Sequence, residues 1–199
     1  MKILGITGSS GSGKSSVCKI IERFAKIKII DADKIAKQLQ DDKTEYYYKI
    51  IEAFGQDIID EKKYIIRKKL AEIIFKDEAQ KLKLDKLTIK YVVDEIKIQI
   101  DKYKKENLDY IIVDAPTLIE ANMNNMFDYI IAVIATRENK IARICERDNI
   151  SIELAEARLD AQKEDDFYKS CANFIILNDD NNLDKKVKDM LQKMEGEKI

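Results

Sequence analysis

Residues 8–15 read Gly8-Ser9-Ser10-Gly11-Ser12-Gly13-Lys14-Ser15, which is a complete G-x-x-x-x-G-K-[ST] phosphate-binding loop. An apolar run precedes it and a helical stretch follows, so a strand should lead into a glycine-rich turn that opens a helix. Backbone N–H groups of such a turn surround phosphate oxygens, and the helix N-terminus adds partial positive charge. Lys14 can reach the β- and γ-phosphates, and the Ser15 hydroxyl can bind Mg²⁺. The alternative is a Gly/Ser-rich turn without a ligand, but the lysine, the hydroxyl and the context favour a nucleoside triphosphate site.

Composition limits the class of protein and its partners. The chain has 199 residues, 45% of them hydrophobic, which suits one domain with a packed core. Its 36 basic and 37 acidic residues give a net charge of −1, which argues against general nucleic-acid binding. No apolar run approaches the roughly 18 residues of a membrane span, and the N-terminus enters a strand directly, so we expect no membrane association and no signal peptide. Cys18, Cys145 and Cys171 form no metal-binding pattern, which is typical of a reduced cytoplasmic protein.

Two further features of the composition narrow the chemistry. The chain has no histidine, so any proton transfer must use a carboxylate, a lysine, a tyrosine or water. Only six of the 36 basic residues are arginines, so each arginine can mark a need for a planar, bidentate donor.

The hydrophobic pattern predicts a doubly wound α/β fold. Five short apolar runs without polar alternation are expected to form a parallel sheet, at residues 3–6, 27–30, 110–113, 129–134 and 174–177. Amphipathic stretches between and after them predict helices, at residues 16–24, 34–40, 44–54, 67–75, 79–104, 138–147, 152–161 and 183–194. Ligands of such sheets bind beyond the carboxyl ends of the strands.

The chain is expected to form a single domain, residues 1–199. Two of the connections between its strands are longer than a crossover needs, which predicts functional insertions. About eighty residues separate the second and third strands, whereas a simple crossover needs only a dozen or more. Residues 34–104 are therefore expected to be a helical insertion that covers the acceptor site. Residues 137–170 hold four of the six arginines and are expected to form a lid.

Acidic residues follow two of the predicted strands. Asp31 and Asp33 both follow the second strand, where one carboxylate can accept or orient the proton of an acceptor hydroxyl. The other can cap the helix expected from Lys34, and the residues alone do not decide between the two acids. Asp114 ends the third strand, the position of the acid that holds Mg²⁺ directly or through water in P-loop enzymes.

Arg143 and Arg147 are four residues apart and share a helix face. Two guanidinium groups on one face can bind polyphosphate and offset charge in a transition state. The alternative is a solvated basic face paired with Glu146 or Asp148. The scarcity of arginine favours the phosphate role.

Two features of the insertion have alternative interpretations. Arg67 is its only arginine and therefore a candidate for binding a phosphate of the acceptor, but a surface ion pair, for example with Glu72, is the alternative. Tyr46, Tyr47 and Tyr48 could stack on a base, although their helical spacing favours packing.

In this order, the motifs resemble those of the dephospho-CoA kinase family nearly end to end. Residues 6–16, from Ile6-Thr7-Gly8 through Ser16, are similar to the family's L-T-G-x-I-G-S-G-K-S-T opening. Residues 31–36, D-A-D-K-I-A, resemble its D-A-D-x-I-A box, in which the second aspartate is the proposed base; here this is Asp33. This box is the discriminating motif, because many families share the phosphate-binding loop.

Further segments extend the resemblance. Residues 54–55 (F-G) and 67–70 (R-K-K-L) resemble its F-G and R-x-x-L motifs, and residues 114–120 are similar to its D-x-P-L-L-F-E segment. The family's lid pattern, R-x-x-x-R-D…A-R…Q, falls on Arg143, Arg147-Asp148, Ala157-Arg158 and Gln162. Asn178 falls on the asparagine that faces the adenine ring.

The chain departs from the family pattern in its insertion. The family usually has T-H-P in the long insertion helix, whereas here Thr88 is followed by Ile89 and Lys90. We therefore expect a divergent member with intact transfer chemistry and altered acceptor packing.

The resemblance implies transfer of the γ-phosphate of ATP to the ribose 3′-hydroxyl of dephospho-CoA, with Mg²⁺. Its site assignments are catalysis by Asp33, Lys14 and Arg143; ATP binding by residues 8–16, Arg147 and Asn178; acceptor binding by Asp33, Arg67 and Arg158; and metal binding by Ser15 and Asp114. The expected partners are these two small molecules, with no nucleic acid and no membrane, for a cytoplasmic monomer or weak homo-oligomer.

Two other functions would share parts of this sequence pattern. A kinase of another small acceptor, such as a nucleoside monophosphate, would share the loop and the arginines, but the D-A-D box counts against it. A switch GTPase needs an N-K-x-D guanine-recognition motif, which residues 178–181 (N-D-D-N) do not supply.

Overall fold

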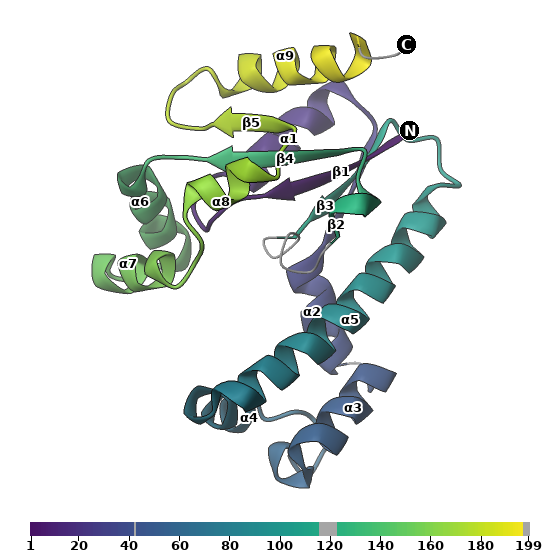
Figure 1. The fold of residues 1–199 in the computed structure, drawn as a ribbon, viewed down its shortest axis with the longest axis vertical. Helices are drawn as coiled ribbons and strands as arrows, with labels where there is room; N and C mark the ends of the chain where they lie inside the picture. Colours follow the sequence, from purple (N-terminus) through teal and green to yellow (C-terminus); the bar gives the residue numbers. More distant parts are fainter. Residues whose placement is uncertain (42, 116–122, 197–199) are drawn as a thin grey trace. The chain divides into compact units, whose positions relative to one another are not determined.

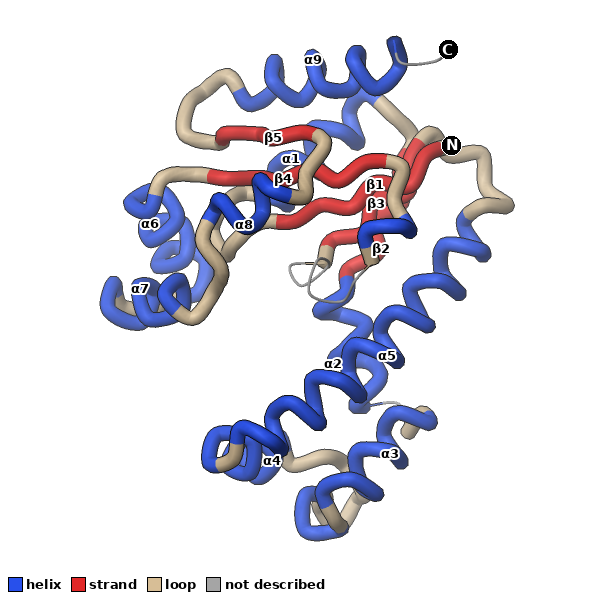
Figure 2. Tube along the Cα trace, in the orientation of Figure 1, coloured by secondary structure: helices blue, strands red, loops and turns tan. Residues whose placement is uncertain are grey.

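Five strands form one sheet in the order β2-β3-β1-β4-β5 (Figures 1 and 2). They are β1 (Lys2–Thr7), β2 (Ile27–Asp31), β3 (Tyr110–Asp114), β4 (Tyr129–Ile134) and β5 (Phe174–Leu177). The central strand β1 runs parallel to β3 and β4, and β4 runs parallel to β5. The predicted five-stranded parallel sheet is therefore confirmed. It places the carboxyl ends of β1, β3 and β4 at one edge, where the phosphate-binding loop begins.

The structure is a computed structural model that describes residues 1–41, 43–115 and 123–196. Its α-helices in these ranges are α1 (Lys14–Phe24), α2 (Ala32–Asp41), α3 (Glu45–Phe54), α4 (Arg67–Lys76), α5 (Glu78–Tyr103), α6 (Arg137–Asp148), α7 (Ile152–Asp160), α8 (Asp165–Ser170) and α9 (Leu183–Gly196). Two short 3₁₀ helices are η1 (Gln56–Ile58) and η2 (Asn124–Met126). Every predicted helix is present. Helix α8 was not predicted, because six residues are too few to show a helical period. Residues 116–120 of the segment that is similar to the family's D-x-P-L-L-F-E motif lie outside the described residues.

The chain divides into two compact units, residues 1–30 with 102–199 and residues 31–101. In the first unit, α1 and α9 pack together on one face of the sheet, and α8 lies against β4 on the other (Figure 1). The core between the sheet, α1 and α9 consists of buried apolar side chains from all three: Leu4, Ile6, Val17, Cys18, Ile20, Ile21, Tyr110, Ile112, Ile131, Val133, Ile176, Val187, Met190, Leu191 and Met194. Helices α6 and α7 form a hairpin with a small apolar cluster of its own, made by Ile144, Ala155 and Leu159.

The second unit is helical and has a separate apolar core. Tyr46 is fully buried in it, and its hydroxyl lies 2.7 Å from the hydroxyl of Thr88 on α5. Tyr47 is also buried, whereas Tyr48 is 60% exposed, so the tyrosines pack much as their spacing predicted. Helix α5 runs without a break through Ile89 and Lys90, where a proline would have removed a helical hydrogen bond. No helix in the described ranges combines the length and the apolarity that a membrane span requires.

Candidate nucleotide site

The phosphate-binding loop joins the central strand β1 to α1, as its sequence predicts. Gly11 and Gly13 have φ angles of +75° and +98°, which only glycine adopts easily. A Cβ atom on Gly13 would collide with the side-chain amide of Asn178, and one on Gly11 would lie 2.5 Å from the carbonyl oxygen of Lys140. The loop is thus enclosed by the start of α6 and by the residue that follows β5, and both neighbours require glycine.

Polar groups in the loop are arranged to receive a ligand. The Lys14 ammonium donates a hydrogen bond to the carbonyl oxygen of Gly8 at 2.8 Å, which holds it beside the first residue of the loop. The hydroxyls of Ser9 and Ser12 are buried and have no hydrogen-bond partner within the described part of the chain. Buried hydroxyls normally have partners, and an oxygen of a bound ligand would satisfy these two.

Arg143 stabilises the loop by donating hydrogen bonds to the backbone carbonyl groups of loop residues. One guanidinium nitrogen lies 3.1 Å from the carbonyl oxygen of Gly11 and 3.3 Å from that of Ser12, and the other donates to the carbonyl oxygen of Asn178 at 2.7 Å. The Asn178 amide in turn donates to the carbonyl oxygen of Ser12 at 2.9 Å. The structure therefore brings Arg143 and Asn178 together under the loop.

Arg147 contacts both the loop and an acidic neighbour. Its guanidinium donates to the Ser10 hydroxyl at 3.3 Å and to both carboxylate oxygens of Asp148 at 2.8 Å. Arg158 on α7 pairs with the same carboxylate. Hydrogen bonds from Arg147 and then Arg158 hold the pKa of Asp148 well below its usual range. Arg147 is therefore paired with Asp148, as the alternative interpretation expected, and it also lies at the loop; its role toward phosphate stays a prediction.

Asp114 ends β3 beside the loop. It is in register with Ile6, the second-last residue of β1, and is half-buried. Burial raises the pKa of the Cys18 thiol to about 12; the Asp114 carboxylate also raises it, whereas the Lys14 ammonium lowers it. Cys18 thus lies within electrostatic reach of both groups. Asp114 and the exposed hydroxyl of Ser15 provide the hard oxygen donors that Mg²⁺ prefers, so these residues fit that ion.

Cys18 should resist alkylation in the folded protein. At pH 8, a pKa of about 12 leaves about one thiol in 10⁴ ionised, and the side chain is also buried. The half-exposed Cys145 and Cys171 should react much faster with iodoacetamide. Mass spectrometry of the labelled native protein measures this, with denatured protein as the control in which all three cysteines react. Rapid labelling of native Cys18 would contradict the packing of α1 against the sheet.

Asp31, the last residue of β2, and Asp33 have different surroundings. An oxygen of Asp31 accepts a hydrogen bond from the backbone N–H of Lys34 at 2.9 Å, so Asp31 caps α2. Asp33 is exposed in the first turn of α2. Arg67 is exposed at the first residue of α4. Asp33 and Arg67 belong to the helical unit, and their assignment to acceptor chemistry stays a prediction.

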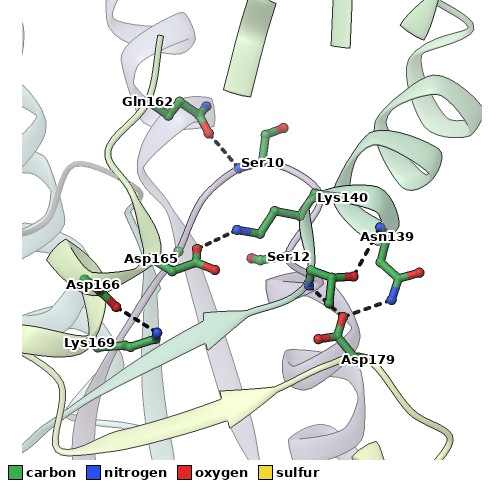
Figure 3. A network of polar contacts seen from close by, with 12 residues as sticks. Ser10, Ser12, Asn139, Lys140, Gln162, Asp165, Asp166, Lys169 and Asp179 are labelled. Atoms are coloured by element: carbon green, nitrogen blue, oxygen red, sulfur yellow. Dashed lines mark hydrogen bonds and ion pairs between the residues drawn. The ribbon is translucent and has the colours of Figure 1, made fainter. Parts of the chain in front are cut away.

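Further polar residues surround the loop (Figure 3). Gln162 was part of the predicted lid pattern, whereas Lys140, Asp165 and Asp179 were not predicted. Gln162 accepts a hydrogen bond from the backbone N–H of Ser10 at 2.8 Å, and the Lys140 ammonium pairs with Asp165 at 2.5 Å. Asp179 accepts hydrogen bonds from the first turn of α6, which fixes that helix next to the end of β5. Lys140 could have been predicted from the sequence as a residue near the loop, because it lies about one helical turn before Arg143 on the same face. Its acidic partner could not, because it lies 25 residues further along the chain.

The sheet order, the phosphate-binding loop after the central strand and the arginines against that loop define a P-loop kinase. The sequence model of the dephospho-CoA kinase family matches residues 2–184. The chain belongs to this family.

Named relatives agree with this membership. The chain is 34% identical over 190 residues to a dephospho-CoA kinase of Listeria innocua, with 96% of this chain and 94% of that protein covered. It is 32% identical over 193 residues to one of Lactobacillus johnsonii, with 96% and 97% covered. The solved structure of dephospho-CoA kinase from Campylobacter jejuni is similar with a TM-score of 0.70 and 28% identity, covering 99% of this chain and 98% of that one.

Proposed function

We propose that the protein transfers the γ-phosphate of ATP to the ribose 3′-hydroxyl of dephospho-CoA, which gives coenzyme A and ADP. The observation that carries this proposal is the complete phosphate-binding loop in a chain that matches the dephospho-CoA kinase family from residue 2 to residue 184. Dephospho-CoA and ATP are then the substrates. The three cysteines form no disulfide, which suits a cytoplasmic protein, and we propose a monomer or weak homo-oligomer.

Phosphoryl transfer depends mainly on positioning and on stabilising negative charge. The N–H groups of residues 8–16 and the Lys14 ammonium would hold the β- and γ-phosphates. Arg147 already lies at the Ser10 hydroxyl and would add charge at the same place. Asn178 lies at the far side of the loop, where the family resemblance places the adenine ring. Arg143 would contribute by fixing the loop and by its charge.

Mg²⁺ would be held by Ser15 and Asp114, together with phosphate oxygens of the nucleotide. When bound, it neutralises phosphate charge and orients the nucleotide. The two protein donors are a hydroxyl at the start of α1 and a carboxylate at the end of β3. A site with one or two protein oxygens is usual for this ion in kinases.

Asp33 would accept the proton of the attacking 3′-hydroxyl. Asp31 is engaged in capping α2, and this favours Asp33 as the acid left for chemistry. Without histidine, a carboxylate is the natural general base of this chain. We assign Arg67 and Arg158 to acceptor binding, and residues 34–104 to the acceptor-binding insertion.

An acceptor screen tests this function. Purified protein is incubated with MgATP and, in separate reactions, dephospho-CoA, AMP, CMP or UMP, and both ADP and the phosphorylated acceptor are quantified. We expect coenzyme A and ADP in equal amounts with dephospho-CoA and little product with the nucleotides. Phosphorylation of a nucleoside monophosphate without formation of coenzyme A would overturn the proposal.

Replacing Arg67 by alanine should raise the apparent KM for dephospho-CoA roughly ten- to a hundredfold, because a charged hydrogen bond to a phosphate contributes about 1.5–3 kcal/mol. The KM for ATP should stay unchanged. Steady-state kinetics with each substrate varied in turn measures both constants. Lys68→Ala, at the neighbouring exposed position of α4, is the matched control. Unchanged acceptor kinetics would assign Arg67 to the surface instead.

A further inference from the structure

Lys140 connects the phosphate-binding loop to the segment that follows α7 (Figure 3). Its backbone packs so closely on Gly11 that a Cβ atom there would lie 2.5 Å from the Lys140 carbonyl oxygen. Its ammonium pairs with Asp165, the first residue of α8, at 2.5 Å. One residue of α6 thus contacts both segments.

Burial makes this ion pair different from its neighbours. The Lys140 side chain is only 9% exposed and that of Asp165 is 25% exposed. The nearby pair between Lys169 and Asp166 has a similar length, 2.8 Å, but its acid is 87% exposed. A buried ammonium needs a partner because desolvation without one is costly, so Lys140 fixes the position of Asp165.

Gln162 lies three residues before Asp165 and reaches the loop itself. Its side-chain oxygen accepts the backbone N–H of Ser10 at 2.8 Å. Backbone N–H groups of this loop hold phosphate oxygens in P-loop enzymes. The Lys14 ammonium, which reaches the terminal phosphate in such enzymes, lies at Gly8. We infer that the start of the loop, including Ser10, is the end that faces the terminal phosphate. The Gln162 oxygen then occupies a backbone N–H, that of Ser10, which an oxygen of this phosphate would otherwise accept.

A pocket of about 400 Å³ adjoins these groups. Ser9, Lys140, Gln162 and Asp165 are among its lining residues. The Ser9 hydroxyl is buried and has no hydrogen-bond partner in the described ranges. The space beside Gln162 therefore has room and a polar group for a ligand oxygen.

We propose that Gln162 contacts the terminal phosphate of ATP and that Lys140, through Asp165, is the residue that positions it. This inference rests on the use of ATP in the proposed function. When the phosphate takes the Ser10 N–H, the Gln162 side chain rotates and its amide NH₂ donates to the same phosphate. Lys140 keeps the segment in place during this exchange and does not itself touch the nucleotide.

Binding of two nucleotides that differ only in the terminal phosphate tests the proposal. Dissociation constants for MgADP and for Mg²⁺ with a non-hydrolysable ATP analogue are measured by calorimetry. Gln162→Ala should weaken binding of the analogue roughly tenfold. This is the low end for a charged hydrogen bond, because in the wild-type protein the Gln162 side chain must first leave the Ser10 N–H. ADP should bind as before. Lys140→Met should show the same selective loss of affinity for the analogue. The double variant should bind the analogue no more weakly than the single variant with the lower affinity.

The control is Lys169→Met, which breaks the exposed pair with Asp166 and should change neither constant. Asp165→Asn keeps the side-chain volume and carries the same prediction if Lys140→Met fails to fold. Equal weakening of both nucleotides by Lys140→Met or Asp165→Asn would make the ion pair merely structural. If Gln162→Ala binds the analogue more tightly than the wild-type protein does, Gln162 only competes with phosphate for the Ser10 N–H. These measurements need no acceptor, so a failure to phosphorylate dephospho-CoA would refute the proposed function and leave this result standing.

Discussion

Replacing Lys14 by alanine is expected to abolish phosphoryl transfer while the fold survives. The ammonium lies beside Gly8 at the start of the loop, and the side chain is part of the loop and not of the apolar core. Loss of one preorganised electrostatic group that stabilises a transition state typically slows turnover by about 10²–10³-fold. We expect at least the upper end of this range, because the lysine carries a full charge. Formation of ADP in the presence of acceptor, followed at saturating ATP, measures the loss.

The matched control is Lys19→Ala, which removes an exposed lysine from the same helix. Both variants should unfold at temperatures within a few degrees of the wild-type protein. Full activity in a folded Lys14→Ala protein would remove the phosphate-binding interpretation of residues 8–15.

Asp33→Asn should slow turnover by roughly 10²-fold or more and leave ATP binding nearly intact, as expected for the loss of a general base. The amide keeps the size and most of the polarity of the side chain, but it cannot accept the proton. Because Asp33 is exposed in the first turn of α2, the substitution should cost little stability. The rate of ADP formation and the dissociation constant for ATP together separate chemistry from binding.

Asp31→Asn is a closely matched control. Asparagine caps helices about as well as aspartate, so α2 should keep its N-terminus and turnover should change little. If instead Asp31→Asn abolishes turnover and Asp33→Asn does not, the two roles proposed for these acids are reversed.

Local sequence patterns were sufficient to predict most of the fold. The apolar runs at 129–134 and 174–177 coincide with β4 and β5. In β4 the reason is burial on both faces, whereas β5 is an edge strand in which Ile175 and Leu177 are exposed. The phosphate-binding loop was predicted in full, since its function depends on consecutive residues. The alternation of strands and helices then predicted the parallel sheet.

The contacts that depend on distant residues could not be predicted in the same way. The pair of Lys140 and Asp165 joins two helices, and no local pattern links their positions. Arg143 donates hydrogen bonds to backbone carbonyl groups, which every residue possesses, so no sequence motif indicates these contacts. The cap of α2 could be assigned to Asp31 only from its hydrogen bond with Lys34.

The α6–α7 hairpin is held by two kinds of force that respond differently to ionic strength. Its apolar cluster around Ile144 does not depend on charge. The contacts of Arg147 and Arg158 with Asp148 join two guanidinium groups that are 59% and 43% exposed, and dissolved salt screens such pairs over a Debye length of about 8 Å under physiological conditions. Rising salt should therefore weaken the pairs with Asp148 before it disturbs the apolar cluster. The hairpin thus stays packed while the strength of its charged contacts changes with the ionic composition of its surroundings.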